Sequence, residues 1–309
     1  MNSEVKILEN EIASTRPRIL DYAELMKPEL TFLSVLSALC GFYLGTTGTF
    51  DAWLFLHVAM GTTLLGGGAG ALNQYIEQRF DALMKRTERR PLPAGRLFPA
   101  EALTFGIILS TLGLVELTFF TNILTGFLGA LTFTTYIFLY TPLKRITPWS
   151  TIVGGIPGAI PPMMGWTAAR NEITIEAWIL FAILFCWQMP HFFSLAWMYK
   201  KDYARAGFKM LTVTDIDGRR TSRQIVFFSV VLLPVTIMTT AFGVTGIAYA
   251  IVATVLGIVF LMYGILLQRY TRHLRADDAQ KVNSYARKLF FASLIYLPLL
   301  MLMMSIDKV

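Results

Sequence analysis

The feature that most limits what this chain can fold into is a series of apolar stretches, each close to 20 residues long. A helix of about 20 apolar residues spans the ~30 Å hydrocarbon layer of a membrane. Because 55% of the 309 residues are hydrophobic and only 15% are charged, a soluble domain has too little interior for them. The sequence therefore predicts an all-α polytopic membrane protein, a bundle of nine transmembrane helices. Their predicted ranges are 29–47, 52–72, 101–120, 122–141, 151–169, 176–199, 225–243, 246–267 and 289–305.

The positions of lysine and arginine predict the orientation of the bundle. Of the 27 such residues, all except Arg170 and Lys308 lie before the first stretch or in the loops after the second, fourth, sixth and eighth stretches, which are on the same side of the membrane as the N-terminus. By the positive-inside rule the N-terminus and these loops are cytoplasmic and the C-terminus is outside, which requires an odd number of spans. The net charge of +7 is attributed to this topology and to anionic head groups, so no nucleic-acid partner is expected.

The chain is expected to form one domain, because it contains no linker rich in Pro, Gly or Ser. Residues 1–26 are interpreted as a cytoplasmic N-terminal tail and 27–309 as a single transmembrane domain, with long polar loops at about 73–100 and 200–224. The N-terminal region lacks the apolar core of a signal peptide. The two cysteines, Cys40 and Cys186, lie inside predicted spans, which excludes a disulfide framework.

Three polar residues follow the second apolar stretch at intervals of four. On a continuing helix Asn73, Glu77 and Asp81 lie on one side, and a cluster of cations follows them. Hard oxygen ligands hold Mg²⁺, and the planar forks of arginine bind phosphate oxygens. The spacing favours a site for a metal and a polyphosphate. The alternative is a solvated helix end whose acids pair with neighbouring cations.

These residues belong to a longer ordered pattern. The Asn-x₃-Glu-x₃-Asp run at 73–81, followed by Arg-Thr-Glu-Arg-Arg-Pro-Leu-Pro at 86–93, resembles the first acidic motif of UbiA-type intramembrane prenyltransferases. Residues 140–144 resemble their Tyr-x₃-Lys element, and 154–162 resemble their glycine and proline stretch. The segments 187–193 and 202–207 resemble the branch of that family that transfers a farnesyl group to haem b.

The resemblance implies a set of roles for residues of this chain. It implies one or two Mg²⁺ ions as cofactor, and haem b and farnesyl diphosphate as substrates. The product is haem o, with a hydroxyethylfarnesyl side chain. It also implies a protein in the cell inner membrane among lipid, upstream of a haem a synthase or of terminal oxidase assembly. The implied metal ligands are Asn73, Glu77, Asp81 and Asp202, which are catalytic together with Tyr140 and Lys144; the implied diphosphate ligands are Arg86, Arg90, Lys144, Arg145 and Lys201.

The chain departs from the family pattern at two positions. Glu77 stands where many members have aspartate, which keeps the charge and lengthens the side chain by one methylene. The second acidic motif has one carboxylate, Asp202, where members of the superfamily often have two. The number of magnesium ions therefore stays open.

His191 lies inside the sixth predicted span, beside Pro190. A histidine within a membrane span is a functional candidate, and the proline should kink the helix and open space around it. We expect His191 either to contact haem in its pocket or to ligate the iron. The alternative is a hydrogen bond to a neighbouring helix. His57 and Glu116, near the outer face, are given no role.

Other functions remain as alternatives. They are a prenyltransferase with another acceptor such as a quinone precursor, a transporter or carrier of an anionic lipid or haem, and a haem-binding assembly factor. A transporter should place its polar groups near the midplane of the bilayer, whereas these acids lie at the cytoplasmic rim. An assembly factor has no need for Asn73, Glu77 and Asp81 together.

Overall fold

The computed structural model describes residues 17–272 and 278–309 of the chain; residues 1–16 of the predicted tail lie outside this range. Every regular element in the described part is a helix. The helices are α2 (Arg18–Leu25), α3 (Pro28–Gly45), α4 (Ala52–Asp81), α5 (Pro99–Phe119), α6 (Ile123–Thr134), the π-helix η1 (Thr135–Tyr140), α7 (Thr141–Leu143), α8 (Ser150–Ala159), α9 (Pro161–Arg170), α10 (Ile175–Met198), α11 (Lys200–Arg205), α12 (Leu211–Thr214), α13 (Arg219–Ala241), α14 (Ile247–Arg272) and α15 (Asp278–Ile306).

Within the described residues, eight helices are long and apolar enough to cross a membrane. The remaining predicted span, 151–169, consists of the two ten-residue helices α8 and α9. Ile160 between them keeps helical dihedral angles, but Pro161 and Pro162 have no N–H to donate to the preceding turn. The predicted all-α membrane bundle is thus confirmed, with eight of the nine predicted spans present among the described residues as helices long enough to cross a membrane and the ninth present as a broken helix. The protein is a multi-pass membrane protein.

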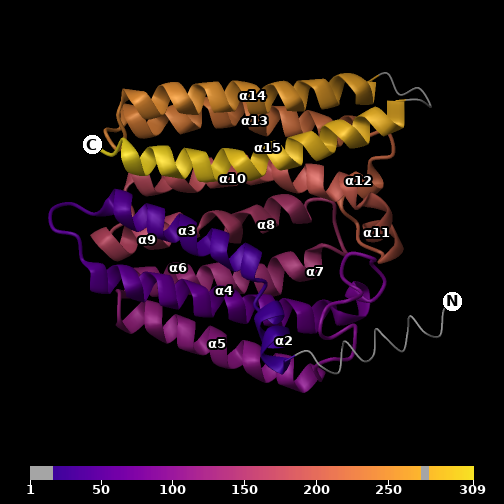
Figure 1. Cartoon of the computed structure of the whole chain (residues 1–309), viewed down its shortest axis with the longest axis horizontal. Coiled ribbons are helices and arrows are strands. Elements are labelled where there is room, and N and C mark those ends of the chain that lie inside the picture. Colours follow the sequence, from indigo (N-terminus) through magenta and orange to yellow (C-terminus); the bar gives the residue numbers. More distant parts are fainter. Residues whose placement is uncertain (1–16, 273–277) are drawn as a thin grey trace.

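The long helices run side by side (Figure 1). The most extensive packing joins α4 with α5, α3 with α9, α13 with α14, and α10 with α13. The helices α11 and α12 and the loop after α4 lie at one end, while the C-terminus lies at the opposite end (Figure 1). This end of the bundle therefore brings together the two polar loops that the sequence singles out.

Helices α3 and α9 approach each other so closely that only glycine fits at the crossing. A Cβ atom at Gly165 would overlap the carbonyl oxygen of Ala38, and one at Gly41 would overlap that of Pro162. Small residues at helix crossings let backbones approach closely where lipid gives no hydrophobic driving force. The broken span is thereby held against α3, beside the wall of the cavity described below.

Candidate functional site

Helix α4 continues nine residues beyond its predicted apolar span, to Asp81. This extension carries Asn73, Glu77 and Asp81 on one face, and all three are buried. The chain turns immediately afterwards, and the Thr87 hydroxyl donates to the Asp81 backbone carbonyl across 2.9 Å. The polar end of α4 is thus part of the folded interior, and the alternative of a solvated helix end is wrong.

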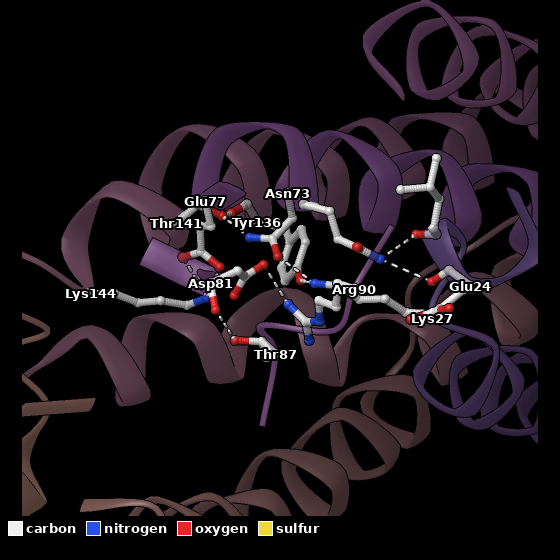
Figure 2. Close-up of polar contacts among 12 residues, drawn as sticks. Glu24, Lys27, Asn73, Glu77, Asp81, Thr87, Arg90, Tyr136, Thr141 and Lys144 are labelled. Atoms are coloured by element: carbon white, nitrogen blue, oxygen red, sulfur yellow. Dashed lines mark hydrogen bonds and ion pairs between the residues drawn. The ribbon is translucent and has the colours of Figure 1, made fainter. Parts of the chain in front are cut away.

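Both α4 carboxylates lie against cations from other parts of the chain (Figure 2). Lys144 Nζ donates to Glu77 Oε1 and Oε2 across 2.9 and 3.0 Å. Arg90 donates to Asp81 Oδ2 across 2.7 Å. The Lys144 and Glu77 side chains are only 13% and 8% exposed, so their attraction is weakly screened. Burial lowers the pKa of Lys144, but the Glu77 carboxylate together with Tyr140 and Tyr136 raises it overall.

Lys27 is a site residue that the sequence analysis counts only among the cations before the first apolar stretch. Its ammonium donates to Asn73 Oδ1 and lies 3.4 Å from the Tyr136 hydroxyl, so both its hydrogen-bond partners are neutral. Its pKa is lowered to about 7, chiefly by burial and then by the positive charges of Arg90 and Lys144, which Glu77 and Asp81 only partly offset.

A bend between α2 and α3 aims Lys27 at the site. Lys27 has a φ of 50°, in the left-handed region that side-chain-bearing residues seldom adopt. The bend is fixed by neighbours: Gln74 of α4 donates to the carbonyls of Glu24 and Leu25, and Thr31 donates to that of Met26. Strain of this kind persists only where surrounding contacts determine the backbone. The only sequence signal for this residue was a cation directly before an apolar span.

The π-helix η1 supplies an aromatic wall beside these charges. The Tyr136 and Tyr140 rings lie 5.6 Å apart, and Lys144 Nζ lies 4.6 Å from the centre of the Tyr140 ring. Thr141 connects η1 to α4, since its hydroxyl donates to the Tyr136 carbonyl and accepts from the Asn73 amide. Pro142 has no N–H for the helix, which favours the irregular turn here. Single turns of π-helix recur at functional sites.

We call this group the cation cluster. It contains more cations than carboxylates, since Glu77 and Asp81 face Lys27, Arg90 and Lys144. The surplus cation, Lys27, has no carboxylate among its hydrogen-bond partners in the described part of the chain. Such a group attracts an anion. Its members are Lys27, Asn73, Glu77, Asp81, Arg90 and Lys144.

The structure does not bring every predicted site residue into the cation cluster. Asp202, on α11, forms an ion pair with Arg205 on its own helix. Arg86 lies over the Tyr199 ring at 5.3 Å and Arg145 over the Phe80 ring at 4.2 Å, so these arginines stack on aromatic rings. Lys201 is exposed. In the structure as described, no three His, Cys, Asp or Glu side chains lie close enough to hold one metal ion.

A cavity of about 230 Å³ extends from the cation cluster into the bundle. Lys27, Tyr136 and Tyr140 line one part of it, and His191 and Phe192 of α10 line another. Its walls are mainly apolar side chains of α3, α4, α8 and α10. The cavity can therefore hold an elongated apolar group whose charged end lies at the cluster.

His191 is fixed between two aromatic rings and one hydroxyl. Its ring stacks on Trp187 and Phe290, with centroids 5.1 and 4.8 Å apart, and its Nδ1 lies 2.7 Å from Ser293 Oγ on α15. Ser293 Oγ donates its only proton to the Phe290 carbonyl, across 2.5 Å. When Ser293 donates to this carbonyl it accepts from Nδ1–H, and in that tautomer Nε2 keeps a lone pair. The hydrogen bond to a neighbouring helix, which the sequence analysis gives as the alternative, is present, and His191 also lies on the cavity wall.

The oxygen donors of α4 fit a hard divalent cation. Asn73, Glu77 and Asp81 offer an amide oxygen and two carboxylates, the ligand types that Mg²⁺ accepts. The carboxylates have lysine and arginine as partners here, so a metal binding alone would displace cations into a site already rich in them. A metal that arrives with a polyphosphate supplies new anionic partners for those cations. The residues present thus fit a metal–diphosphate pair better than a metal alone.

Comparisons with known proteins agree with this geometry. The model of the UbiA prenyltransferase family matches residues 34–295. The chain is 44% identical over 298 residues to Protoheme IX farnesyltransferase of Solibacter usitatus (strain Ellin6076), covering 93% of this chain and 98% of that protein.

Solved structures show the same fold at low sequence identity. A structure concerning digeranylgeranylglyceryl phosphate synthase superposes with a TM-score of 0.76 at 18% identity, covering 94% of this chain and 98% of that one. A UbiA homolog from Archaeoglobus fulgidus bound to GPP and Mg²⁺ gives a TM-score of 0.61 at 12% identity, covering 90% and 99%. On its family match and its full-length relatives, the chain belongs to the UbiA prenyltransferase family.

Proposed function

We propose that this protein transfers the farnesyl group of farnesyl diphosphate to a vinyl group of haem b, with addition of water, to give haem o. The observation that carries the proposal is the cavity that joins Lys27 and Tyr136 at one part to His191 at another. Farnesyl diphosphate needs cations for its diphosphate and an apolar cavity for its chain. Haem b needs an aromatic wall with a nitrogen ligand for its iron. The 44% identity to Protoheme IX farnesyltransferase supports this pairing of substrates.

The cation cluster binds the diphosphate and stabilises its departure. As the C–O bond to the farnesyl group breaks, the electron pair leaves with the diphosphate, and Lys27, Arg90 and Lys144 face the charge that develops there. Magnesium, when bound through Asn73, Glu77 and Asp81 with Asp202 as a further ligand, would supply Lewis-acid stabilisation of the same charge. We propose Arg86, Arg145 and Lys201 as outer cations that attract the substrate to the site.

The aromatic walls serve the carbon end of the reaction. The faces of Tyr136 and Tyr140 lie beside the cluster, where they stabilise positive charge on the allylic carbon. The vinyl group then attacks this carbon and forms the new C–C bond. Water captures the resulting cation and loses a proton, which leaves the hydroxyl group of haem o. The apolar cavity limits premature capture of the allylic cation by water.

His191 positions haem b in this scheme. Its Nδ1–H is directed to Ser293, so Nε2 keeps the lone pair that an iron ligand requires. We propose ligation of the haem iron by Nε2. Haem b bound to the protein should show a shifted Soret band, and His191→Ala should abolish that shift. If His191→Ala loses activity but keeps the wild-type Soret band, ligation is refuted and His191 has only a packing role.

The remaining features follow from the same scheme. We propose residues 1–26 as a cytoplasmic tail and 27–309 as one catalytic domain in the cell inner membrane. The N-terminus and the cation cluster face the cytoplasm and the C-terminus faces outward, which suits a charged, water-soluble diphosphate leaving group. A haem a synthase or terminal oxidase assembly would receive the product.

The direct test is product mass after incubation of purified protein with haem b, farnesyl diphosphate and Mg²⁺. Formation of haem o is expected, and Asp81→Asn should lower turnover about 100-fold or more, because it weakens a proposed magnesium ligand and removes the ion-pair partner of Arg90. Asp217→Asn, at an exposed acid of the loop before α13, is the matched control and should keep wild-type turnover. Absence of haem o with the wild type would refute the acceptor. Full turnover of Asp81→Asn would refute the site.

The alternatives give different outcomes in the same reaction. A prenyltransferase for a quinone precursor would prenylate a hydroxylated aromatic ring and leave haem b unchanged. A carrier or an assembly factor would bind farnesyl diphosphate or haem without releasing diphosphate. Diphosphate release therefore separates an enzyme from a binding protein, and the prenylated product identifies the acceptor.

A further inference from the structure

A second groove lies on the outer surface of the bundle, between α14 and α15. The two helices pack side by side, and two ring pairs fix their register: Phe260 with Tyr296 at 5.2 Å, and Tyr270 with Tyr285 at 5.0 Å. The groove has a volume of about 570 Å³. None of the residues that line it lines the cavity of the cation cluster, so it is a separate feature.

The groove is apolar along its length and basic at one end. Val259, Phe291 and Ile295 line the apolar part and are exposed, while Arg287 and Lys288 line the basic end together with Ser284. The part of α15 from Leu289 to Ile306 rises about 27 Å at 1.5 Å per residue, close to the thickness of the hydrocarbon layer. Arg287 and Lys288 therefore lie at the depth of the lipid head groups, and the apolar part lies at the depth of the acyl chains.

The two cations have no carboxylate partner in the described part of the chain. No Asp or Glu lines the groove, and neither Arg287 nor Lys288 forms an ion pair among the described residues. Both are held near rings, with Arg287 5.7 Å from the Phe291 centroid and Lys288 5.1 Å from the Tyr285 centroid. Their charges are thus available to an anion at the end of an apolar groove.

We propose that this groove binds one anionic phospholipid. The phosphate lies at Arg287 and Lys288, the Ser284 hydroxyl donates to it, and an acyl chain follows Phe291 and Ile295. A zwitterionic lipid fills the apolar part equally well, so the charge of the head group is what the site distinguishes. Basic pockets between helices at the membrane surface recognise anionic head groups in this way. The proposal is independent of the reaction at the cation cluster.

The test uses the full chain in detergent, titrated with phosphatidylglycerol or with phosphatidylcholine of the same acyl chains, with bound lipid counted by native mass spectrometry. Phosphatidylglycerol should bind at least tenfold tighter. The double change Arg287→Gln and Lys288→Gln should lower that affinity roughly 30-fold and lower the affinity for phosphatidylcholine much less, because the head group of that lipid has no net charge. Equal binding of the two lipids by the wild type would overturn the proposal.

A matched control removes two positive charges from the same layer of helices but outside the groove. Arg223 of α13 and Arg269 of α14 are exposed, lie near the ends of the same layer of helices, and do not line the groove. Changing both to Gln should preserve the preference for phosphatidylglycerol; an equal loss would show general attraction to basic residues and refute a site.

A third variant tests the groove itself. Ala292→Leu keeps all charges and fills the apolar part beside Ile295. It should weaken binding of both lipids at least fivefold. Unchanged binding would refute occupation of the groove. Because the groove is separate from the cavity, farnesyl diphosphate should bind to all these variants as to the wild type.

Discussion

Replacing Lys27 by methionine should weaken diphosphate binding without weakening the fold. Lys27 is the surplus cation of the cluster, and its hydrogen-bond partners are the neutral Asn73 and Tyr136. Two unit charges 4 Å apart attract by about 4 kcal/mol at an effective dielectric constant near 20. The side chain is only half-buried, so we expect about 2–3 kcal/mol, or a 30- to 150-fold rise in Kd for farnesyl diphosphate.

The effect on stability should have the opposite sign. The folded-state pKa of Lys27, about 7, lies below its unfolded value, so folding disfavours the charged form. This cost to stability is full below about pH 7 and shrinks as the pH rises toward the unfolded pKa, since in that interval the unfolded chain holds a proton that the folded chain has lost. Lys27→Met removes that cost, so the melting temperature at pH 8 should stay equal or rise.

Lys144→Met is the matched control, since it also removes a lysine charge from the cluster. Its loss leaves Glu77, only 8% exposed, without its cation. Removing one partner of a buried ion pair costs about 3–5 kcal/mol, so this variant should melt at a lower temperature as well as bind diphosphate weakly. Titration calorimetry and thermal unfolding of the three proteins measure both quantities. Wild-type affinity in Lys27→Met, or a fall in its melting temperature like that of Lys144→Met, would refute the assignment of Lys27 as the surplus cation.

Three further outcomes are expected. Bound diphosphate should raise the pKa of Lys27 from about 7, so above pH 7 binding takes up a proton and the affinity falls by up to tenfold per pH unit. Calorimetry in two buffers of different ionisation enthalpy measures this proton uptake, which should be absent from Lys27→Met. Glu116→Leu should cost about 1–2 kcal/mol in unfolding measurements because it leaves His57 buried without its 2.5 Å partner, yet farnesyl diphosphate binding should not change. Phe208→Ala should lower the free energy of unfolding by about 3 kcal/mol, since the buried Phe208 ring packs 5.9 Å from the Phe80 ring and connects the two polar loops. The segment 200–214 should then be cleaved faster by protease, and an unchanged cleavage rate would contradict this.

The helix bundle could be predicted because the lipid layer places the same requirement on every membrane-spanning segment. Backbone groups in lipid must bond within their own helix, so hydrophobic length alone locates the helices. The break at Ile160 follows from Pro161 and Pro162, which have no N–H for the helix. A proline in the sequence indicates where a hydrogen bond is lost, but it does not specify how far the helix bends. The spacing of Asn73, Glu77 and Asp81 placed them on one face because α4 continues past its apolar part.

Pairings between distant residues could not be predicted in the same way. His57 and Glu116 were given no role, yet they form a buried contact between α4 and α5. Nothing local in either segment specifies the partner, because the contact depends on the rotation and depth of two packed helices. Asp202 is the converse case: its motif suggested a shared metal site, whereas the structure places it beside Arg205.

The cluster owes its excess positive charge to Lys27, which lies in the bend between α2 and α3. Glu77 and Asp81 are supplied by one helix, and their cations come from the segments that follow α4 and η1, so these charges compensate one another. Lys27 enters from a left-handed bend that α4 fixes through Gln74. A change that straightened this bend would remove the surplus cation and leave both ion pairs intact. We therefore expect Gln74→Leu to weaken diphosphate binding as Lys27→Met does, although Gln74 does not line the cavity. Normal binding would show that the bend does not depend on Gln74.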